Sequence, residues 1–354
     1  MVILITGGAG FVGSNLAIHL KTALKNSVII ALDNLKRRGS EINVSRLKVH
    51  KIKFIHGDIR NKEDLNLKHL GLTHIIECSA EPSVLAGFEE SPKYLINTNL
   101  MGLVNCLELA RLSGARVIFL STSRVYPIET LRGLKYTISP TRFVLNITQP
   151  VKGVSRKGIS EVFPLNGWRS LYGTTKLSSE LIIHEYIKLY GLRAVIDRCG
   201  VIAGPWQMGK VDQGVFTYFL LNHFLKKPLS YIGFGGSGKQ VRDILHIDDL
   251  ADLILLQLRH LDSLNGQIFN VGGGADNSLS LLEATKICQN LTGNDVLIRK
   301  ITKIRHADIP LYISDNTRVT KALGWRPQRN STQTLSDIYN WIKTNKDEIV
   351  SALL

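Results

Sequence analysis

The sequence predicts an α/β protein built on a doubly wound parallel sheet. Short runs of Val, Ile and Leu recur through the first half of the chain and are separated by longer segments with a helical pattern. Uninterrupted apolar runs indicate strands buried on both faces, as in a parallel sheet. A glycine-rich turn also joins the first run to the first helical segment. The expected strands are 2–5, 28–32, 52–55, 74–77 and 116–120, and the clearest helices are 12–24 and 93–113.

The glycine-rich turn indicates a dinucleotide-binding strand, turn and helix of the Rossmann type. Its useful glycines are Gly7, Gly10 and Gly13. Glycines at this spacing permit a tight turn, a close approach of a pyrophosphate and close packing of helix on strand. Phe11 and Val12 follow at the start of the helix, where free N–H groups and the positive end of the helix dipole favour phosphate.

The end of the second run carries an acid that favours NAD over NADP. The Asp33 carboxylate can accept hydrogen bonds from ribose hydroxyls and would repel a 2′-phosphate. Residues 36–38 (Lys, Arg, Arg) oppose this preference, because a guanidinium can hold that phosphate. A strand-end cap is the structural alternative for Asp33. Asp58, after the third run, is either a contact of the adenine amino group or a turn-forming residue.

The remainder of the chain predicts a second, smaller α/β lobe that binds substrate. Prolines and glycines interrupt residues 127–170, which we expect to form a long surface excursion, and a helix follows over 171–190 and a strand over 192–198. Residues 204–240 look rich in loops. We expect the NAD-binding domain to span 1–175, with returning segments near 192–204 and 240–272. The substrate lobe then occupies most of 176–354.

Composition and charge limit the kinds of partner that we expect the protein to bind. The formal charge is +15, but Lys and Arg are scattered without an aromatic-interleaved stripe, which favours a small anionic ligand over nucleic acid. The 4 cysteines are widely spaced, which indicates neither a disulfide framework nor a metal site and suits a reducing cytoplasm. The first residues resemble a strand rather than a signal peptide, and no apolar run is long enough to span a membrane.

Three residues suggest redox chemistry at a hydroxyl-bearing carbon. Tyr172 and Lys176 stand at positions i and i+4 of a helical segment and so share one face. A nearby ammonium and a positive nicotinamide ring would lower the pKa of the phenol, which is ordinarily about 10. Thr122, at the end of a buried run, could hydrogen-bond the reacting oxygen. The structural alternatives are a chance pair on a solvated helix for Tyr172 and Lys176, and a strand-end cap for Thr122.

Taken together, these motifs resemble the extended short-chain dehydrogenases/reductases of the NAD-dependent epimerase/dehydratase group. Further matching segments are Ser121–Ser123, Gly238–His246, Phe269–Gly272, Asp315 and Leu323–Pro327. The resemblance implies nucleotide diphosphate sugars as substrates and Thr122, Tyr172 and Lys176 as the catalytic set. It implies Arg242 and Arg305 as diphosphate contacts. Besides the three glycines, Phe11 and Val12, it implies these cofactor contacts: Asp33, Asn34, Asp58, Ile59, Ser79, Asn99, Tyr172 and Lys176.

The residues after Thr122 narrow the reaction. Dehydratases of this group carry an Asp–Glu pair there, whereas this chain has Ser123 and Arg124. We therefore expect an epimerase, with NAD regenerated in each turnover. A UDP-sugar 4-epimerase, a reductase, a decarboxylase and a non-catalytic binding protein are the alternatives.

Other segments resemble epimerases that act at carbon 2 of CDP-linked sugars. They are 33–39, Gln207, 212–214 and 277–283. By this resemblance Ser123, Gln207 and Gln213 face the substrate. Pro127 and the segment 80–83 depart from the usual pattern of these epimerases, so the sequence does not determine which sugar is bound. Relatives associate through helices, so we expect a homodimer or a homotetramer.

Overall fold

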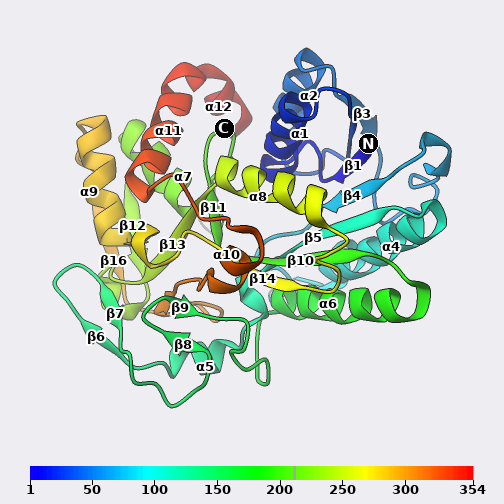
Figure 1. The fold of residues 1–354 in the computed structure, drawn as a ribbon. Coiled ribbons are helices and arrows are strands. Elements are labelled where there is room, and N and C mark those ends of the chain that lie inside the picture. The colour runs from blue at the N-terminus through cyan, green and yellow to red at the C-terminus, as the bar shows by residue number, and fades with distance from the viewer. Residues whose placement is uncertain (89, 210–212, 354) are drawn as a thin grey trace.

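The main element of the fold is a sheet of seven parallel strands in the order β14-β10-β5-β4-β1-β2-β3. It is seen in a computed structural model that describes residues 1–88, 90–209 and 213–353 (Figure 1). The strands are β1 (Val2–Thr6), β2 (Val28–Asp33), β3 (Lys53–His56), β4 (His74–Glu77), β5 (Arg116–Thr122), β10 (Ala194–Cys199) and β14 (Ile268–Val271). The predicted doubly wound parallel sheet is confirmed.

The direction of winding reverses at β1. The chain proceeds from β1 to β2 and β3 on one side, then returns to place β4 and β5 on the other. Thr6 at the end of β1 therefore pairs in register with Glu77 at the end of β4. In sheets of this kind the crevice outside the carboxyl ends at this point is where ligands bind.

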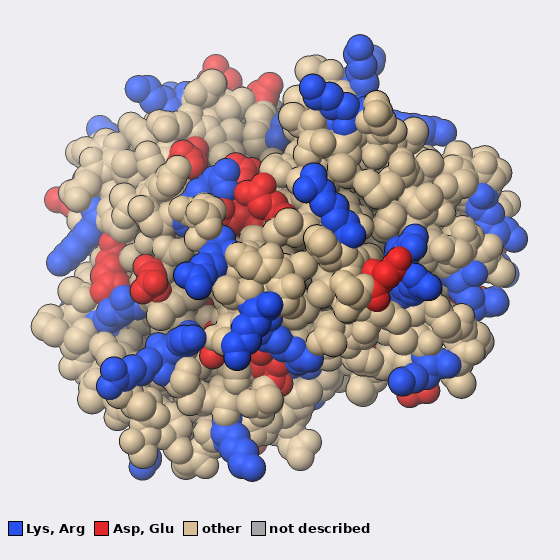
Figure 2. Space-filling view, viewed as in Figure 1, with Lys and Arg blue, Asp and Glu red and all other residues tan. Residues whose placement is uncertain are grey.

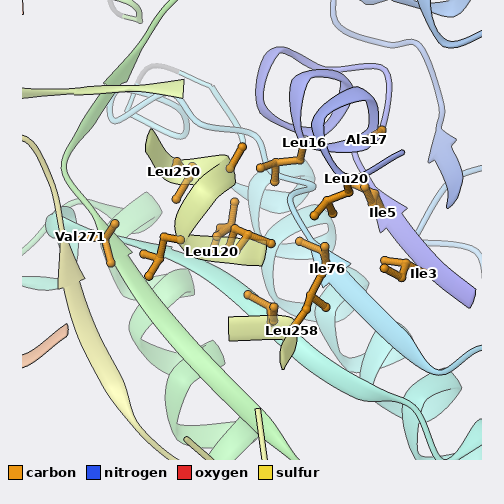
Figure 3. Packing of buried hydrophobic residues seen from close by; sticks show 14 of the residues in the cluster. Ile3, Ile5, Leu16, Ala17, Leu20, Ile76, Leu120, Leu250, Leu258 and Val271 are labelled. Carbon is orange, nitrogen blue, oxygen red and sulfur yellow. The ribbon is translucent and has the colours of Figure 1, made fainter. Parts of the chain in front are cut away.

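Helices cover both faces of the sheet. One layer holds α1 (Phe11–Ala23) and α8 (Ile247–His260), and the other holds α4 (Gly102–Ser113) and α6 (Leu171–Tyr190). Figure 3 shows the first layer, where Leu16 and Leu20 of α1 lie over Ile5 and Ile76 of the sheet and Leu250 of α8 lies near Leu120 of β5. Burial of these apolar side chains on both faces explains why the strands are uninterrupted apolar runs.

The second lobe has a smaller sheet and its own core. Val201 and Ala203, at the two ends of β11, pair in parallel with β13, and β13 also pairs with β15 and β17. A separate apolar cluster lies among the surrounding helices. The elements are β11 (Val201–Ala203), α7 (Val215–Phe224), β12 (Leu229–Ile232), β13 (Val241–His246), β15 (Ser278–Ser280), α9 (Leu281–Thr292), β16 (Ile298–Ile301), β17 (Leu311–Tyr312), α10 (Thr317–Leu323), α11 (Ser331–Thr344) and α12 (Lys346–Leu353).

Two segments differ from their predictions. The expected helix 93–113 is divided into α3 (Lys93–Ile96), a π-helical turn (Asn97–Met101) and α4. The expected loop region 204–240 contains α7 and β12. The α7 helix is apolar on nearly every side and mostly buried, so it lacks the one-sided pattern by which a helix is recognised in a sequence.

The excursion after residue 127 is anchored rather than loose. It contains α5 (Ile128–Arg132) and two hairpins, β6 (Tyr136–Ile138) with β7 (Phe143–Leu145) and β8 (Val154–Ser155) with β9 (Gly158–Ile159). Ile159 and Phe163 are buried. The carbonyl of Ile159 accepts a hydrogen bond from the Asn270 side chain at 2.8 Å, so the excursion is fixed to the end of β14.

Charge is spread over the surface seen in Figure 2, where Lys and Arg are dispersed and Asp and Glu lie among them. Within the described residues we found no helix with the length and apolar character that a membrane span requires.

One buried carboxyl gives the fold a pH-dependent stability. Asp197 in β10 is fully buried, one oxygen accepts a 2.7 Å hydrogen bond from Gln257, and the other has no partner among the described residues. Burial raises the pKa of Asp197 to about 7. The folded state thus favours the protonated form, and the stability this provides is lost as pH rises through the folded pKa.

We predict that Asp197→Asn changes this pH dependence. Relative to the wild type, the variant should gain about 2–4 kcal/mol between pH 4 and pH 8, since it has no proton to lose. Urea unfolding at several pH values measures the difference in the free energy of unfolding. Parallel profiles for the two proteins would contradict the assignment.

Candidate functional site

A cleft of about 630 Å³ lies along the carboxyl ends of β1, β2, β4, β5 and β10. Its walls also include residues 206–208 and 213–214, from the second lobe. Most of the predicted site residues line this one cleft, namely Gly7, Gly10, Phe11, Val12, Gly13, Asp33, Asn34, Asp58, Ile59, Ser79, Thr122, Ser123, Tyr172, Lys176, Gln207 and Gln213.

The glycine turn forms the phosphate end of the cleft. The amide of Gly10 donates to the carbonyl of Gly7 at 3.0 Å and closes the turn. A Cβ on Gly13 would overlap that carbonyl, so the close packing of α1 on β1 requires glycine there. No side chain caps the start of α1. Its first N–H groups are therefore available to a pyrophosphate.

Asp33 stands beside the turn at the end of β2. Its carboxylate accepts the amides of Ala9 at 3.1 Å and Leu35 at 2.8 Å. Burial raises the pKa of Asp33, and these backbone hydrogen bonds oppose the shift. The carboxylate therefore orders the turn, and it also lines the cleft that a ribose would occupy.

The far end of the cleft holds a cluster of charge around Asp58. The Asp58 carboxylate accepts from Arg60 and from Asn34, the latter at 2.9 Å. The hydrogen bonds from Arg60 hold the pKa of Asp58 well below its usual range. Lys36 lies 3.8 Å from the centre of the Tyr94 ring, and Arg60 packs on the same ring. Tyr94 also lines the cleft, so this end offers an aromatic face.

Thr122 and Tyr172 are brought together by the packing of α6 on the end of β5. Ser170 caps α6 by accepting the amide of Gly173 at 3.2 Å. A Cβ on Gly173 would overlap the carbonyl oxygen of Arg124, so glycine allows the start of α6 to lie directly against the turn after Thr122. The Tyr172 phenol then hydrogen-bonds Thr122.

Lys176 lies one turn further along α6 and is almost fully buried. Its ammonium donates to the carbonyl of Leu120 at 2.8 Å and lies 3.7 Å from the Glu77 carboxylate. The ring of Phe119 is 4.4 Å away. Glu77 thus provides the counter-charge that a buried ammonium needs.

The Tyr172 phenol keeps its proton at neutral pH. Loss of hydration raises the pKa of Tyr172 to about 12, although the hydrogen bond with Thr122 and the charge of Arg124 act in the opposite direction. For the phenol to act as a base, a further positive charge must be supplied in the cleft.

A buried ion pair supports these residues from below. Arg198 in β10 and Glu180 in α6 are 2.7 Å apart and almost fully buried. The Ser121 hydroxyl, beside Thr122, donates to Glu180 at 2.5 Å. Burial lowers the pKa of Arg198, but the hydrogen bonds and charge of Glu180 outweigh it and hold that pKa above its ordinary value. The pair therefore joins β10, β5 and α6.

Three predicted residues lie outside the lining of the cleft. Asn99 is buried and bonds both backbone groups of Glu81, which places it behind the 79–84 loop. Arg242 pairs with Asp308 at 2.9 Å, and burial lowers the pKa of Arg242 to about 10. Arg305 lines a second hollow of about 330 Å³ with Arg132 and His306. The structure does not bring these two arginines to the main cleft.

The residues expected to face the substrate all line the cleft. Ser123 and Arg124 lie on the wall directly after Thr122. The amide of Gln207 is engaged within its own lobe, donating to Ile202 at 3.0 Å and accepting from Thr217 at 2.7 Å. Gln213 also lines the wall, and Asp212, part of the same sequence segment, lies outside the described residues.

Sequence reasoning missed several residues of the site. Tyr94, Glu77 and Trp206 belong to segments without a recognisable motif. An acid at the end of an apolar run was the available signal for Glu77, since Asp33 was identified in that way. Among the described residues, no cluster of His, Cys, Asp and Glu is suited to hold a metal ion.

The chain belongs to the NAD dependent epimerase/dehydratase family, whose model matches residues 3–272. The cofactor is accordingly NAD. The glycine turn, the uncapped start of α1 and Asp33 fit its pyrophosphate and ribose.

Similarity to individual proteins extends over nearly the whole chain. The CDP-paratose 2-epimerase of Salmonella typhi is 31% identical, with 96% of this chain and 99% of the relative covered. UDP-glucose 4-epimerase of Thermus thermophilus, solved with NAD, is 25% identical, with a TM-score of 0.77 and coverage of 97% and 99%. DesIV of Streptomyces venezuelae, a dTDP-glucose 4,6-dehydratase solved with NAD, is 28% identical, with a TM-score of 0.77 and coverage of 98% of each chain.

We predict that Glu180→Gln destabilises the protein by about 3–5 kcal/mol, because it leaves the Arg198 cation buried without its counter-charge. Urea unfolding provides the measurement. Glu108→Gln is the matched control, since Glu108 pairs with Arg111 at the surface, where an ion pair contributes about 0–1 kcal/mol. Equal effects of the two substitutions would contradict the supporting role of the buried pair.

Proposed function

We propose that this protein is an NAD-dependent nucleotide-sugar epimerase. One observation carries the proposal. The Thr122 and Tyr172 hydroxyls meet in the cleft that begins at the glycine turn, and the two residues after Thr122 are Ser123 and Arg124. This arrangement supports proton transfer at a hydroxyl group beside a hydride acceptor.

The reaction begins and ends at one hydroxyl-bearing carbon of the sugar. NAD supplies a site that accepts a hydride from that carbon and later returns it. Tyr172, as phenolate, removes the hydroxyl proton, and Thr122 donates a hydrogen bond to the oxygen as it becomes a carbonyl. The keto sugar then presents its other face, and Tyr172 returns the proton to the oxygen. Inversion at that carbon is the net result.

Lys176 sets the protonation state of Tyr172 in this scheme. Its ammonium is bound to the Leu120 carbonyl and to Glu77. The positive charge of the oxidised cofactor, added to that of Lys176, would favour the phenolate and lower the pKa of Tyr172 from about 12.

The cleft favours epimerisation over dehydration. Elimination of water from the keto sugar needs an acid and a base next to the catalytic threonine. Ser123 and Arg124 occupy those places on the cleft wall. Neither has a carboxyl group, and a guanidinium does not give up its proton in proteins.

For the sugar we propose a CDP-paratose or CDP-tyvelose type of substrate, epimerised at carbon 2. The support is the 31% identity with the Salmonella typhi enzyme over nearly the full length of both chains. UDP-sugar 4-epimerisation is the second candidate, and it is favoured by the likeness to the Thermus thermophilus enzyme. In either case Arg242 would contact the diphosphate only by exchanging Asp308 for a phosphate oxygen.

We also propose a cytoplasmic homo-oligomer. Leu112 of α4 and Leu181 and Leu189 of α6 are more than half exposed, on neighbouring helices at one face of the sheet. Exposed apolar side chains gathered on one face favour association with a second copy. Four free cysteines suit a reducing compartment.

We predict that proton NMR of a panel of CDP-, UDP-, GDP- and dTDP-sugars will show one of them converted to its epimer without added cofactor. Tyr172→Phe should lower the rate about 10²- to 10⁴-fold by removing the general acid–base. Tyr186→Phe is the matched control, since Tyr186 lies on the same helix and bonds Glu108 at the surface. Conversion of no sugar, or equal rates for Tyr172→Phe and wild type, would refute the proposal.

A further inference from the structure

A second-lobe segment, residues 205–208, is bound to the helices beside the glycine turn. The Arg46 guanidinium of α2 (Ser40–Val49) stacks on the Trp206 ring, 3.9 Å from its centre. The same guanidinium donates to Asn43 at 2.6 Å and to Asn15 at 3.0 Å. Burial lowers the pKa of Arg46 to about 10. Because its hydrogen bonds fix the plane of the cation, Trp206 stacks on a preformed surface.

Further contacts attach the same segment. Asn15 of α1 donates to the carbonyl of Pro205 at 3.2 Å. Met208 packs closely on Gly39, because a Cβ added to Gly39 would lie only 2.6 Å from the Cγ of Met208. On the opposite side, the Trp206 ring lies 5.7 Å from that of Trp341 in α11. The segment therefore connects the NAD-binding half to the helical core of the second lobe.

The backbone of the segment is strained at its central residue. Trp206 has a φ of 70°, a left-handed conformation that a bulky residue adopts only where its surroundings hold it. The ring of Trp206 is in contact with Arg46 and Trp341.

Both sides of this attachment are walls of the dinucleotide cleft. Trp206 and Met208 line it from one side, and Gly39 and Asn43 from the other. Asn43 also donates to the carbonyl of Ala9, within the glycine turn, at 2.8 Å. A dinucleotide seated on the turn would therefore be bordered both by α2 and by the segment 205–208.

We propose that Arg46 and Trp206 form a clasp that retains NAD in the cleft during turnover. The inference rests on the proposed function, because an epimerase needs the same cofactor to take up a hydride and to return it. Release of the cofactor between the two transfers would leave an oxidised sugar in the cleft. Arg46 and Trp206 are positioning residues here. They join the two walls of the cleft and slow the separation of these walls that release of NAD requires.

The test measures NAD release without any sugar. Purified protein is loaded with NAD and diluted into excess alcohol dehydrogenase and ethanol, which convert each released NAD to NADH and report the rate by absorbance. Arg46→Met removes the cation and keeps an apolar stem. Trp206→Gly removes the ring and adopts the left-handed backbone without strain. Arg111→Met is the control, because Arg111 stacks on Tyr190 at the outer surface.

Each clasp variant should release NAD about five- to tenfold faster than wild type, the effect expected for a partly buried cation–π contact. The two single substitutions remove the same interaction. The double variant should therefore release NAD no faster than the faster of the two single variants. Arg111→Met should match wild type. Circular dichroism confirms that each variant is folded, and Arg46→Met alone suffices if Trp206→Gly does not fold.

Release rates of both folded variants equal to wild type would overturn the clasp, as would multiplicative effects in the double variant. These outcomes are separate from failure of the proposed function. A protein that converts no sugar but releases NAD faster when the clasp is removed keeps the clasp and loses the epimerase proposal. If the protein epimerises a sugar normally and every variant releases NAD at the wild-type rate, the epimerase proposal stands and the clasp is refuted.

Discussion

The buried ion pair between Arg198 and Glu180 is the interaction on which the geometry of the site depends. It joins strand β10 to helix α6, and the Ser121 hydroxyl adds the end of β5. Thr122 follows Ser121, and Tyr172 and Lys176 lie on the two turns of α6 before Glu180. Desolvation makes such a pair costly to form, and breaking it by removing one partner is costlier still. The pair therefore fixes the relative positions of the reacting hydroxyls.

The carboxyl ends of the strands combine fixed positive charge with buried carboxylates. Glu77 faces Lys176 at 3.7 Å, and Asp33 orders the glycine turn through backbone amides. Burial in this cleft raises the pKa of Tyr172 to about 12. In the proposed mechanism Tyr172 acts as the base only when the cleft gains positive charge, which would couple proton transfer to the presence of the oxidised cofactor. The segment 205–208 closes one wall of the same cleft.

What the sequence predicted correctly is local. Continuous apolar runs gave the strands, and helix 171–190 matches α6 at both ends, because capping and periodicity are properties of neighbouring residues. What it missed depends on partners far apart in the chain. Glu77 meets Lys176, and Arg46 meets Trp206, only after folding. Asn99 and Arg242 matched motifs, but their contacts with Glu81 and Asp308 could not be read from spacing. The division of the chain at residue 175 stays a prediction.

The central claim is that one carbon of the sugar gives up and regains its own hydrogen within a single turnover. The most direct measurement uses the nucleotide sugar that the protein converts, carrying deuterium at the epimerised carbon, in ordinary water. The account predicts that the product retains the deuterium fully at that carbon, because the hydride never exchanges with solvent. Loss of the deuterium to water would indicate deprotonation of the carbon and would contradict the account.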